Sequence, residues 1–372
     1  MRVGVPREIK NHEYRVGLTP SAVAELSAHG HQVRVEHSAG AAIGFSDADY
    51  QAAGAQIVAT PHELFAGSEL IVKVKEPLAS ERALLGPQHT LFTYLHLAAD
   101  RAQTDELLAS GALCIAYETV SDAQGCLPLL APMSEVAGRM AVQVGAHCLE
   151  KAQGGRGVLL GGVPGVAPGK VVILGGGVVG SQAAAVAVGM GAQVTVLDRS
   201  PDAMRRLDAQ FGNRITTLYS TGAALREQVL TADLLIGSVL VPGAAAPRLV
   251  SAEMVRQMRA GAVLVDVAID QGGCAETSRP TSHAEPTYVV DEVVHYCVTN
   301  MPGAVARTSA QALNNATLPF VLALANKGSR QALQDDVHLR HGLNIAAGQL
   351  CNRAVAEAHQ LPWQSAETLL GG

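Results

Sequence analysis

A glycine-rich segment after an apolar stretch is the strongest chemical signal in this sequence. Residues 170–180 read KVVILGGGVVG, so Gly175, Gly177 and Gly180 form the pattern G-x-G-x-x-G. Where such a pattern follows a strand and opens a helix, the first glycine permits a tight turn and the second lets a pyrophosphate approach the backbone. The third lets the helix pack closely on the strand. The sequence therefore predicts a dinucleotide site here; the alternative is a glycine turn needed only for packing.

A carboxylate follows at the distance along the chain that such a site requires. Asp198 comes directly after the apolar residues 194–197, about 20 residues beyond the glycines, where an acidic side chain binds the adenosine ribose hydroxyls. The same charge repels a 2′-phosphate and favours NAD over NADP. Three nearby cations, Arg199, Arg205 and Arg206, act against that preference. We expect NAD as the cofactor.

Polar side chains at the ends of other apolar segments offer the second set of groups that nicotinamide redox chemistry needs. Lys75, His96 and Asp270 each lie at or just beyond such an end, and in open α/β sheets these positions gather at one edge. A fixed cation binds a substrate carboxylate, and an imidazole, which titrates near neutral pH, transfers protons. Each residue also has a plainer interpretation: a solvated strand end, a structural histidine and a helix cap. Arg15 lies in a charged loop, where a surface cation is the default.

Alternating strand and helix patterns must position these residues. In the first part of the chain the predicted strands are 2–5, 31–36, 55–59, 69–75, 90–97 and 113–119, and the predicted helices are 19–30, 46–54 and 101–110. From residue 170 the predicted strands are 171–174, 193–197, 214–219, 234–240 and 262–267, and the predicted helices are 180–190, 201–211, 221–231 and 251–259. Such alternation is typical of mostly parallel sheets covered by helices on both faces. The predicted fold class is α/β, with two Rossmann-like doubly wound domains and an active-site cleft between them.

The domain boundaries follow from the helical segments. A long helical pattern at 134–152 connects the two alternations, and two more helices are expected at 308–326 and 342–358. Because those closing helices have no sheet of their own, we expect them to pack on the first domain. The substrate domain would then comprise 1–129 and 306–372, and the NAD-binding domain 130–305.

Composition excludes several classes of protein. The 372 residues carry 33 acidic and 27 basic side chains, a net charge of −6, with no basic run, so no nucleic-acid partner is expected. The 38 glycines show no period of three, which excludes collagen. Residues 171–197 lack charge, but glycines interrupt them as in a strand, turn, helix and strand; no membrane partner is expected. With no apolar signal-peptide core near Met1 and no closely paired cysteines, we expect a cytoplasmic protein.

Longer segments of the sequence carry a resemblance to a known family. Residues 2–20 (RVGVPREIKNHEYRVGLTP), 72–77 (VKVKEP) and 92–98 (FTYLHLA) resemble the alanine dehydrogenase and pyridine nucleotide transhydrogenase family. So do five later segments: 131–139 (APMSEVAGR), 154–157 (GGRG), 161–166 (GGVPGV), 266–273 (DVAIDQGG) and 296–302 (YCVTNMP). They span almost the whole chain, in order. Within the family, the sequence is most similar to the NAD-dependent branch that acts on L-alanine.

The resemblance implies an activity and a role for each candidate residue. It implies reversible oxidative deamination of L-alanine to pyruvate and ammonium, with hydride transfer to NAD, by a cytoplasmic homohexamer of amino-acid catabolism. Arg15 and Lys75 resemble the clamp on the substrate carboxylate. His96 resembles the general acid/base, and Asp270 a second essential group. The residues implied to line the substrate pocket are Tyr94, Met133 and Asn300. The residues implied to contact the cofactor are Ser134, Gly175, Gly177, Val178, Val179, Gly180, Asp198, Ser220, Val239, Leu240, Val267, Ala268, Ile269, Asp270, Arg279, Val298, Thr299, Asn300 and Met301.

The sequence departs from some family members, and other functions stay open. Ala203 replaces a basic residue that assists the adenosine end in relatives. Ala323 and Lys327 stand where some members place an acidic and a histidine metal ligand, so no metal is expected. A transhydrogenase subunit would not need the Arg15, Lys75, His96 and Asp270 set, and an opine or saccharopine-type dehydrogenase would need a larger pocket. A catalytically silent NAD-binding protein would not need to keep all these polar groups.

Overall fold

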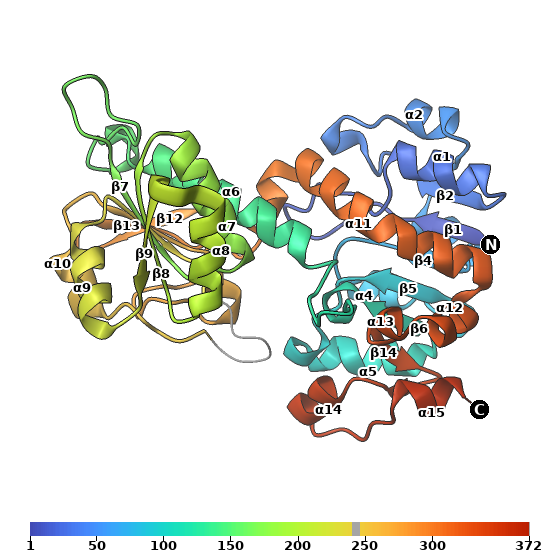
Figure 1. Cartoon of the computed structure of the whole chain (residues 1–372). Helices are drawn as coiled ribbons and strands as arrows, with labels where there is room; N and C mark the ends of the chain where they lie inside the picture. Colours follow the sequence, from blue (N-terminus) through green and yellow to red (C-terminus); the bar gives the residue numbers. More distant parts are fainter. Residues whose placement is uncertain (240–245, 372) are drawn as a thin grey trace. The chain divides into compact units, whose positions relative to one another are not determined.

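The computed structural model describes residues 1–239 and 246–371, and the chain divides into two compact units (Figure 1). The first unit comprises Met1–Met133 and Val305–Gly372, and the second comprises Ser134–Ala304. The sequence predicted boundaries after residues 129 and 305; those of the structure follow residues 133 and 304. The functions assigned to the two domains stay predictions.

The first unit is built on an eight-stranded sheet, counted over the described residues, in the order β15-β14-β6-β5-β4-β1-β2-β3. The strands are β1 (Arg2–Val5), β2 (Gln32–Glu36), β3 (Gln56–Val58), β4 (Leu70–Val72), β5 (Thr90–Thr93), β6 (Leu113–Ala116), β14 (Leu343–Ala346) and β15 (Gln349–Leu350). β1 to β6 pair in parallel, and β14 runs antiparallel to both β6 and β15. The central strands β4 and β5 are buried along their whole length, as expected of a parallel sheet covered on both faces.

Several helices of the first unit begin where the sequence supplies a side-chain cap. Ser46 and Thr60 each accept a hydrogen bond from a backbone N–H of the helix that follows, and Pro61 opens the second of these helices. The helices are α1 (Pro20–Ala28), α2 (Asp47–Ala52), α3 (Pro61–Ala66), α4 (Ala79–Arg82), α5 (Arg101–Ser110), α11 (Ala306–Lys327), α12 (Ser329–Asp335), α13 (Val337–Arg340), α14 (Arg353–His359) and α15 (Ala366–Leu370).

The second unit is a doubly wound sheet of seven strands within the described residues, in the order β12-β13-β11-β10-β7-β8-β9. The strands are β7 (Lys170–Leu174), β8 (Gln193–Asp198), β9 (Ile215–Tyr219), β10 (Leu234–Gly237), β11 (Val263–Asp266), β12 (Thr287–Val290) and β13 (Val293–Tyr296). All pair in parallel except β12, which is antiparallel to β13. The helices are α7 (Val178–Gly189), α8 (Pro201–Phe211), α9 (Gly222–Thr231) and α10 (Ala252–Gln257), and α6 (Ala131–Cys148) begins at the boundary of the units. The predicted α/β class with two Rossmann-like parts is confirmed.

The prediction of a helix at 342–358 is wrong. Leu343–Ala346 forms the buried strand β14 on the edge of β6, and Ala347 and Gly348, both with positive φ, turn the chain into β15. A helix cannot pass through two successive residues in that backbone conformation. The closing segment therefore extends the first sheet, whereas we expected it to consist of helices alone; only residues 353–359 are helical there as predicted.

Candidate functional site

Arg15 is a buried cation with a fixed orientation. Its Nε and Nη2 atoms donate to the two carboxylate oxygens of Glu13, at 2.7 and 2.6 Å, and its Nη1 atom lies 3.0 Å from Met133 Sδ. Burial acts to raise the pKa of Glu13, but hydrogen bonds and charge from Arg15 outweigh it and lower that pKa. A bidentate pair of this kind holds a guanidinium plane rigidly. Arg15 is therefore a buried, oriented cation and not the surface charge that its loop suggested.

Lys75 lies close to Arg15 because two chain segments cross at the end of β4. A Cβ atom on Gly17 would lie only 2.3 Å from the carbonyl oxygen of Val72, so this close approach requires glycine. Burial, followed by the charge of Arg15, lowers the pKa of Lys75. The pKa of Lys75 is thus lowered by a buried neighbouring cation, and a carboxylate bound beside both side chains would favour the charged form of Lys75.

His96 follows β5 in a strained backbone conformation. Its φ of 51° and ψ of 38° lie in the left-handed region, which costs a residue other than glycine about 1–3 kcal/mol. A Glu118 carboxylate oxygen accepts the His96 N–H at 2.6 Å and the Leu95 N–H at 3.1 Å, and lies 3.9 Å from the His96 Nδ1 atom. The ring stacks on Tyr94 with 5.9 Å between centroids and 5° between planes. In this backbone conformation the exposed imidazole of His96 lies against the ring of Tyr94.

Tyr94 and Met133 complete this group of residues in the first unit. Tyr94 is buried, its hydroxyl donates to the Leu129 carbonyl at 2.6 Å, and burial raises the pKa of Tyr94 above its usual range. Arg15 acts on that pKa in the opposite direction, which places its charge near the phenol. The first unit thus brings Arg15, Lys75, Tyr94, His96 and Met133 together. A pair of cations beside an aromatic ring and an imidazole suits a small carboxylate substrate.

The glycine turn in the second unit has the backbone geometry of a phosphate cradle. Gly175 has a φ of 100°, and a Cβ on Gly180 would lie 1.8 Å from the Gly175 carbonyl oxygen, so neither position accepts a larger residue without displacement. A Cβ on Gly177 would meet nothing within 4 Å. Among the described residues the start of α7 is therefore open at Gly177, where the N–H groups of the first helical turn and the helix dipole favour an anion. The residues present fit the pyrophosphate of a dinucleotide.

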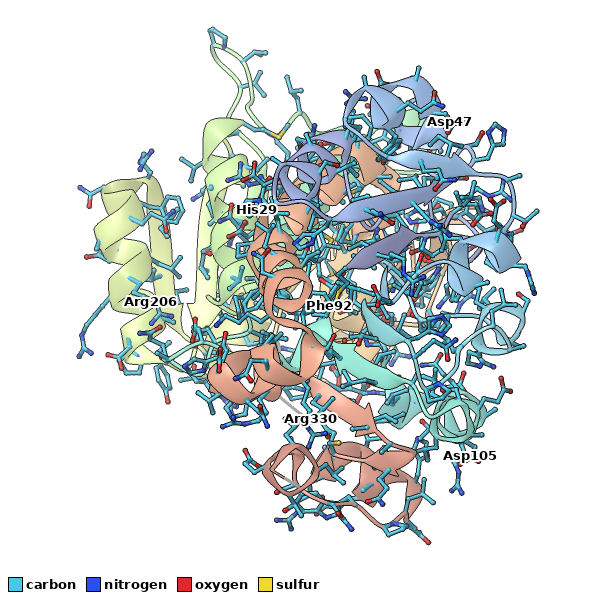
Figure 2. All side chains as sticks on the ribbon, turned by 90° about the vertical axis from the view of Figure 1, so that its right-hand side faces the viewer. His29, Asp47, Phe92, Asp105, Arg206 and Arg330 are labelled. Carbon is cyan, nitrogen blue, oxygen red and sulfur yellow. The ribbon has the colours of Figure 1, made fainter. Side chains whose placement is uncertain are left out.

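Asp198 is joined to this turn by hydrogen bonds. Its Oδ2 atom accepts the Gly176 N–H at 2.5 Å and its Oδ1 atom accepts the Ser200 N–H at 2.7 Å, while its own carbonyl accepts the Ser220 N–H at 2.9 Å. Each carboxylate oxygen has two lone pairs, so the group retains capacity for ribose hydroxyls. Arg206, one of the cations that could offset the charge of Asp198, is exposed on α8 (Figure 2).

A fully buried carboxylate, Asp266, organises the segment that carries Asp270. Its oxygens accept from the Ala268 and Cys274 N–H groups at 3.2 and 2.8 Å and from the Ser278 hydroxyl at 2.5 Å. The segment between these contacts forms a short 3₁₀ helix, Val267–Gln271, with Asp270 exposed on it. This fixed segment presents Asp270 at the carboxyl end of β11, where α/β sheets bind ligands.

The other predicted cofactor residues lie on several segments of the second unit. Arg279 stacks over the Tyr288 ring at 4.1 Å, and the Asn300 carbonyl contacts His283 Nε2 at 2.8 Å. Val298 and Met301 are buried on either side of Thr299 and Asn300. Val239 follows β10 beside Gly175, Ser134 lies in α6, and Val178 and Val179 begin α7. The predicted Leu240 lies outside the described residues.

Several carboxylates that hold the candidate groups were not predicted from the sequence, and three of them contact Arg15, His96 and the segment around Asp270. These are Glu13, Glu118 and Asp266. Glu13 had a local signal, since an acid two residues before a predicted substrate cation is placed to pair with it. Glu118 is 22 residues from the histidine whose N–H it accepts, and no pattern in the sequence predicts that contact.

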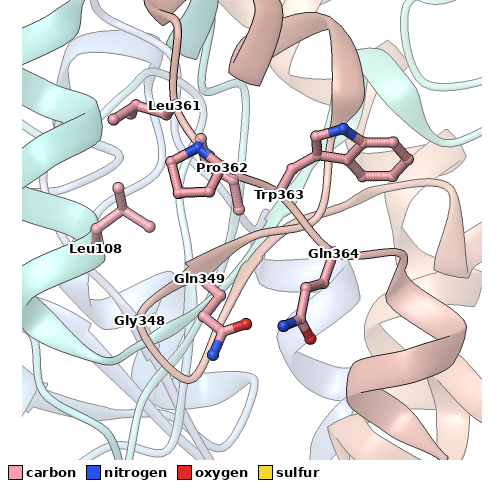
Figure 3. A pocket seen from close by; sticks show the side chains of 8 residues that line it. Leu108, Gly348, Gln349, Leu361, Pro362, Trp363 and Gln364 are labelled. Atoms are coloured by element: carbon pink, nitrogen blue, oxygen red, sulfur yellow. The ribbon is translucent and has the colours of Figure 1, made fainter.

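Other features of the described residues lie apart from these groups. A hollow of about 400 Å³ in the first unit is lined by Leu108, Gly348, Gln349, Leu350, Leu361, Pro362, Trp363 and Gln364 and contains none of the predicted site residues (Figure 3). No group of three or more His, Cys, Asp or Glu side chains is arranged to hold a metal in the part of the chain that the structure describes. Over the same residues, no helix has the length and apolar character needed to cross a membrane.

Comparisons with known proteins agree over both units. The family model "Alanine dehydrogenase/PNT, N-terminal domain" matches residues 4–137, and "Alanine dehydrogenase/PNT, C-terminal domain" matches residues 141–353. The chain is 62% identical to an alanine dehydrogenase of Halomonas elongata over 371 residues and 55% identical to one of Mycolicibacterium smegmatis over 370, with 100% of each chain covered.

Solved structures extend the likeness to the fold. A structure of an L-alanine dehydrogenase matches with a TM-score of 0.95 and 56% identity, covering 97% of this chain and 99% of the other. A transhydrogenase from Sinorhizobium meliloti matches with a TM-score of 0.82 at 23% identity, covering 95% of this chain and 100% of the other. The second likeness concerns the fold alone.

Proposed function

The chain belongs to the alanine dehydrogenase/PNT family, and from this premise we propose how its residues act on substrate and cofactor. It is an oxidoreductase that converts L-alanine reversibly into pyruvate and ammonium. The roles of individual residues and the choice of NAD form the proposal, which the geometry around the residues supports.

The glycine turn and Asp198 hold NAD. The N–H groups at the start of α7 bind the pyrophosphate, and Asp198 binds the adenosine ribose through oxygens already oriented by Gly176 and Ser200. Its negative charge at this position disfavours a 2′-phosphate. NAD, when bound, supplies the acceptor for the hydride that leaves the alanine Cα atom.

Arg15 and Lys75 hold the substrate carboxylate. Arg15 is prevented from rotating by Glu13, so the entropy of orienting a guanidinium is lost on folding and not on binding. Lys75 contributes a second positive charge, which binding of a carboxylate stabilises. Tyr94 and Met133 restrict the space beside these cations and favour a short side chain such as the methyl group of alanine.

His96 and Asp270 move protons on the substrate. Alanine reacts as the free amine, its ammonium proton having gone to solvent, and loss of hydride from Cα leaves an iminium ion to which water adds. The carbinolamine then loses ammonia and its hydroxyl proton and becomes pyruvate, and the ammonia takes up a proton to give ammonium. His96 accepts a proton from the water and returns it to the leaving nitrogen, and Asp270 stabilises the positive charge of the iminium. Proton transfer by a positioned group contributes roughly 10²–10⁴-fold to such reactions.

The observation that carries this proposal is the buried Arg15–Glu13 pair beside Lys75 and the Tyr94–His96 stack. A protein that only bound nucleotide, or passed hydride between two nucleotides, would not need this group. A homohexameric assembly and a cytoplasmic location are further predictions, which follow from the family.

The proposal is tested by supplying the full-length protein with NAD and four amino acids, L-alanine, glycine, L-serine and L-lysine, and following NADH formation. We expect the highest kcat/KM with L-alanine and a much lower value with NADP in place of NAD. Folded protein that binds NADH but forms none from L-alanine would overturn the assignment. A preference for L-lysine would favour the saccharopine-type alternative.

A further inference from the structure

The backbone that carries Lys75 is held on one side by a side chain instead of a strand. β4 ends at Val72, and beyond it the β5 side still has backbone contacts: the Lys73 N–H donates to Phe92 and the Tyr94 N–H donates to Val74. On the other side the neighbour is β1, which ends at Val5. There the Val74 N–H donates to Glu8 Oε1 at 2.7 Å, and the Lys75 N–H points to the same oxygen at 3.4 Å.

Glu8 is part of a buried cluster of charges. Its Oε2 atom lies 3.2 Å from Lys73 Nζ, and the same Nζ lies 2.6 Å from Glu81 Oε1. Lys73 is fully buried, and both carboxylates are nearly so. Burial raises the pKa of Glu8, whereas Lys73 and the Val74 N–H favour its charged form. An isolated carboxylate would be costly here, and Lys73 supplies the opposite charge.

The two carboxylates of this cluster differ in what else they touch. Glu81 Oε2 accepts the Leu78 N–H at 2.9 Å, at the start of α4, and within the described structure Glu81 accepts no hydrogen bond from the backbone of Val74 or Lys75. Glu8 contacts that segment directly. Glu8 and Glu81 are thus similar in burial and charge, but only Glu8 accepts a hydrogen bond from the backbone next to Lys75.

We propose that Glu8 is a positioning residue for the substrate-carboxylate clamp: it sets the place of Lys75 by accepting the N–H groups of Val74 and Lys75, with Lys73 as its counter-charge. The inference rests on the proposed role of Lys75. A shift of the Val74–Lys75 backbone moves the Lys75 ammonium relative to Arg15, whose own position is fixed separately by Glu13. Loss of Glu8 should therefore impair binding of the carboxylate and leave cofactor binding unchanged.

The decisive comparison is Glu8→Gln against the matched variant Glu81→Gln in the full-length protein. Glu8→Gln should raise the KM for pyruvate and for L-alanine roughly ten- to hundredfold, since small misplacements of a binding group have effects of this size. Each variant removes one of the two negative charges that face the Lys73 ammonium, so both variants should lower the melting temperature. Glu81→Gln should leave both KM values within about twofold of the unchanged protein, because it does not touch the clamp.

A second variant, Glu8→Asp, separates the loss of positioning from the loss of stability. Glu8→Asp keeps the charge beside Lys73 but shortens the reach to the Val74 N–H, so it should raise both KM values with a smaller loss of thermal stability. For every variant, the Kd for NADH should equal that of the unchanged protein. Equal KM changes in the Glu8 and Glu81 variants, or none in any of them, would overturn the proposal.

A readout that needs no turnover separates this inference from the proposed function. The rate at which acetic anhydride labels Lys75, measured by peptide mass spectrometry, should rise in both Glu8 variants and stay unchanged in Glu81→Gln. If the unchanged protein failed to oxidise L-alanine, the proposed function would fail while the labelling still decided the role of Glu8. Identical labelling in all variants would show that Glu8 does not position Lys75.

Discussion

At the scale of single residues, three of the chemistry-bearing side chains share one arrangement: a carboxylate holds the side chain or the backbone around it. Glu13 holds the Arg15 guanidinium, Glu118 the His96 backbone, and Asp266 the segment around Asp270. These acceptors fix orientation before any ligand binds. Preorganisation of this kind reduces the entropy that binding and reaction would otherwise cost.

The role of His96 predicts a specific loss. His96→Ala should reduce kcat for alanine oxidation by roughly 10²–10⁴-fold, the usual contribution of a positioned acid/base. Because the proposed role of His96 is to move protons on the substrate, and the contacts described for it are with Glu118 and Tyr94, the Kd for NADH should not change. Steady-state kinetics and a fluorescence titration with NADH measure the two quantities, and retained turnover would remove His96 from the mechanism.

The depressed pKa of Lys75 predicts an alkaline limit on pyruvate reduction. Burial and Arg15 lower this pKa below the ordinary 10.5, so as pH rises the ammonium loses its proton earlier than a solvated lysine would. The kcat/KM for pyruvate, measured at a constant ammonia concentration, should fall through a pH below 10.5. In Lys75→Arg, whose charge persists, this decline should disappear. A profile that stays flat up to that pH in the unchanged protein would contradict the role of Lys75.

At the scale of elements, prediction from sequence succeeded where local chemistry determines both ends. Helices α5 and α8 have the predicted bounds because Asp100 and Ser200 each accept an N–H of the first turn, and Gly111 and Gly212 follow the last. The glycine turn and α7 were identifiable for the same reason. Such signals lie within a few residues of the structure they specify.

Prediction failed where distant partners decide the structure. Residues 343–346 form a strand only because the edge of β6 accepts them, and nothing in the local sequence specifies that partner. In the site, too, local features could be predicted and contacts between distant residues could not. The residue types and their positions at strand ends were predictable, but the contact of Glu118 with His96 and that of Glu8 with Val74 depend on tertiary packing.

The glycine turn predicts a contrast between two positions of one helix. Gly180→Ala places a Cβ 1.8 Å from a backbone oxygen; it should lower the free energy of unfolding by about 1–3 kcal/mol and weaken NADH binding. Gly189→Ala, in the same helix α7, meets nothing within 4 Å and should be neutral or stabilising. Thermal unfolding and NADH titration measure both effects. Equal outcomes for the two variants would contradict the close packing of α7 on β7.

At the scale of the whole molecule, the two units carry complementary halves of the chemistry. The first unit holds the candidate carboxylate clamp and His96, and the second holds the glycine turn, Asp198 and Asp270. The 38 glycines, unusual for a chain of this length, are partly explained by close approaches at the two sites. The absence of a side chain at Gly17 lets the loop that carries Arg15 pack against the backbone of Val72, and its absence at Gly180 lets α7 pack against the turn after β7. The account of the protein as an alanine oxidoreductase depends on both halves acting on one reaction.

The fate of the alanine Cα hydrogen tests that central claim most directly. With L-alanine deuterated at Cα and unlabelled NAD, direct hydride transfer predicts that each NADH formed carries one deuterium at the nicotinamide C4, detectable by mass spectrometry and NMR. NADH that forms without the label, with deuterium released to water, would contradict the account.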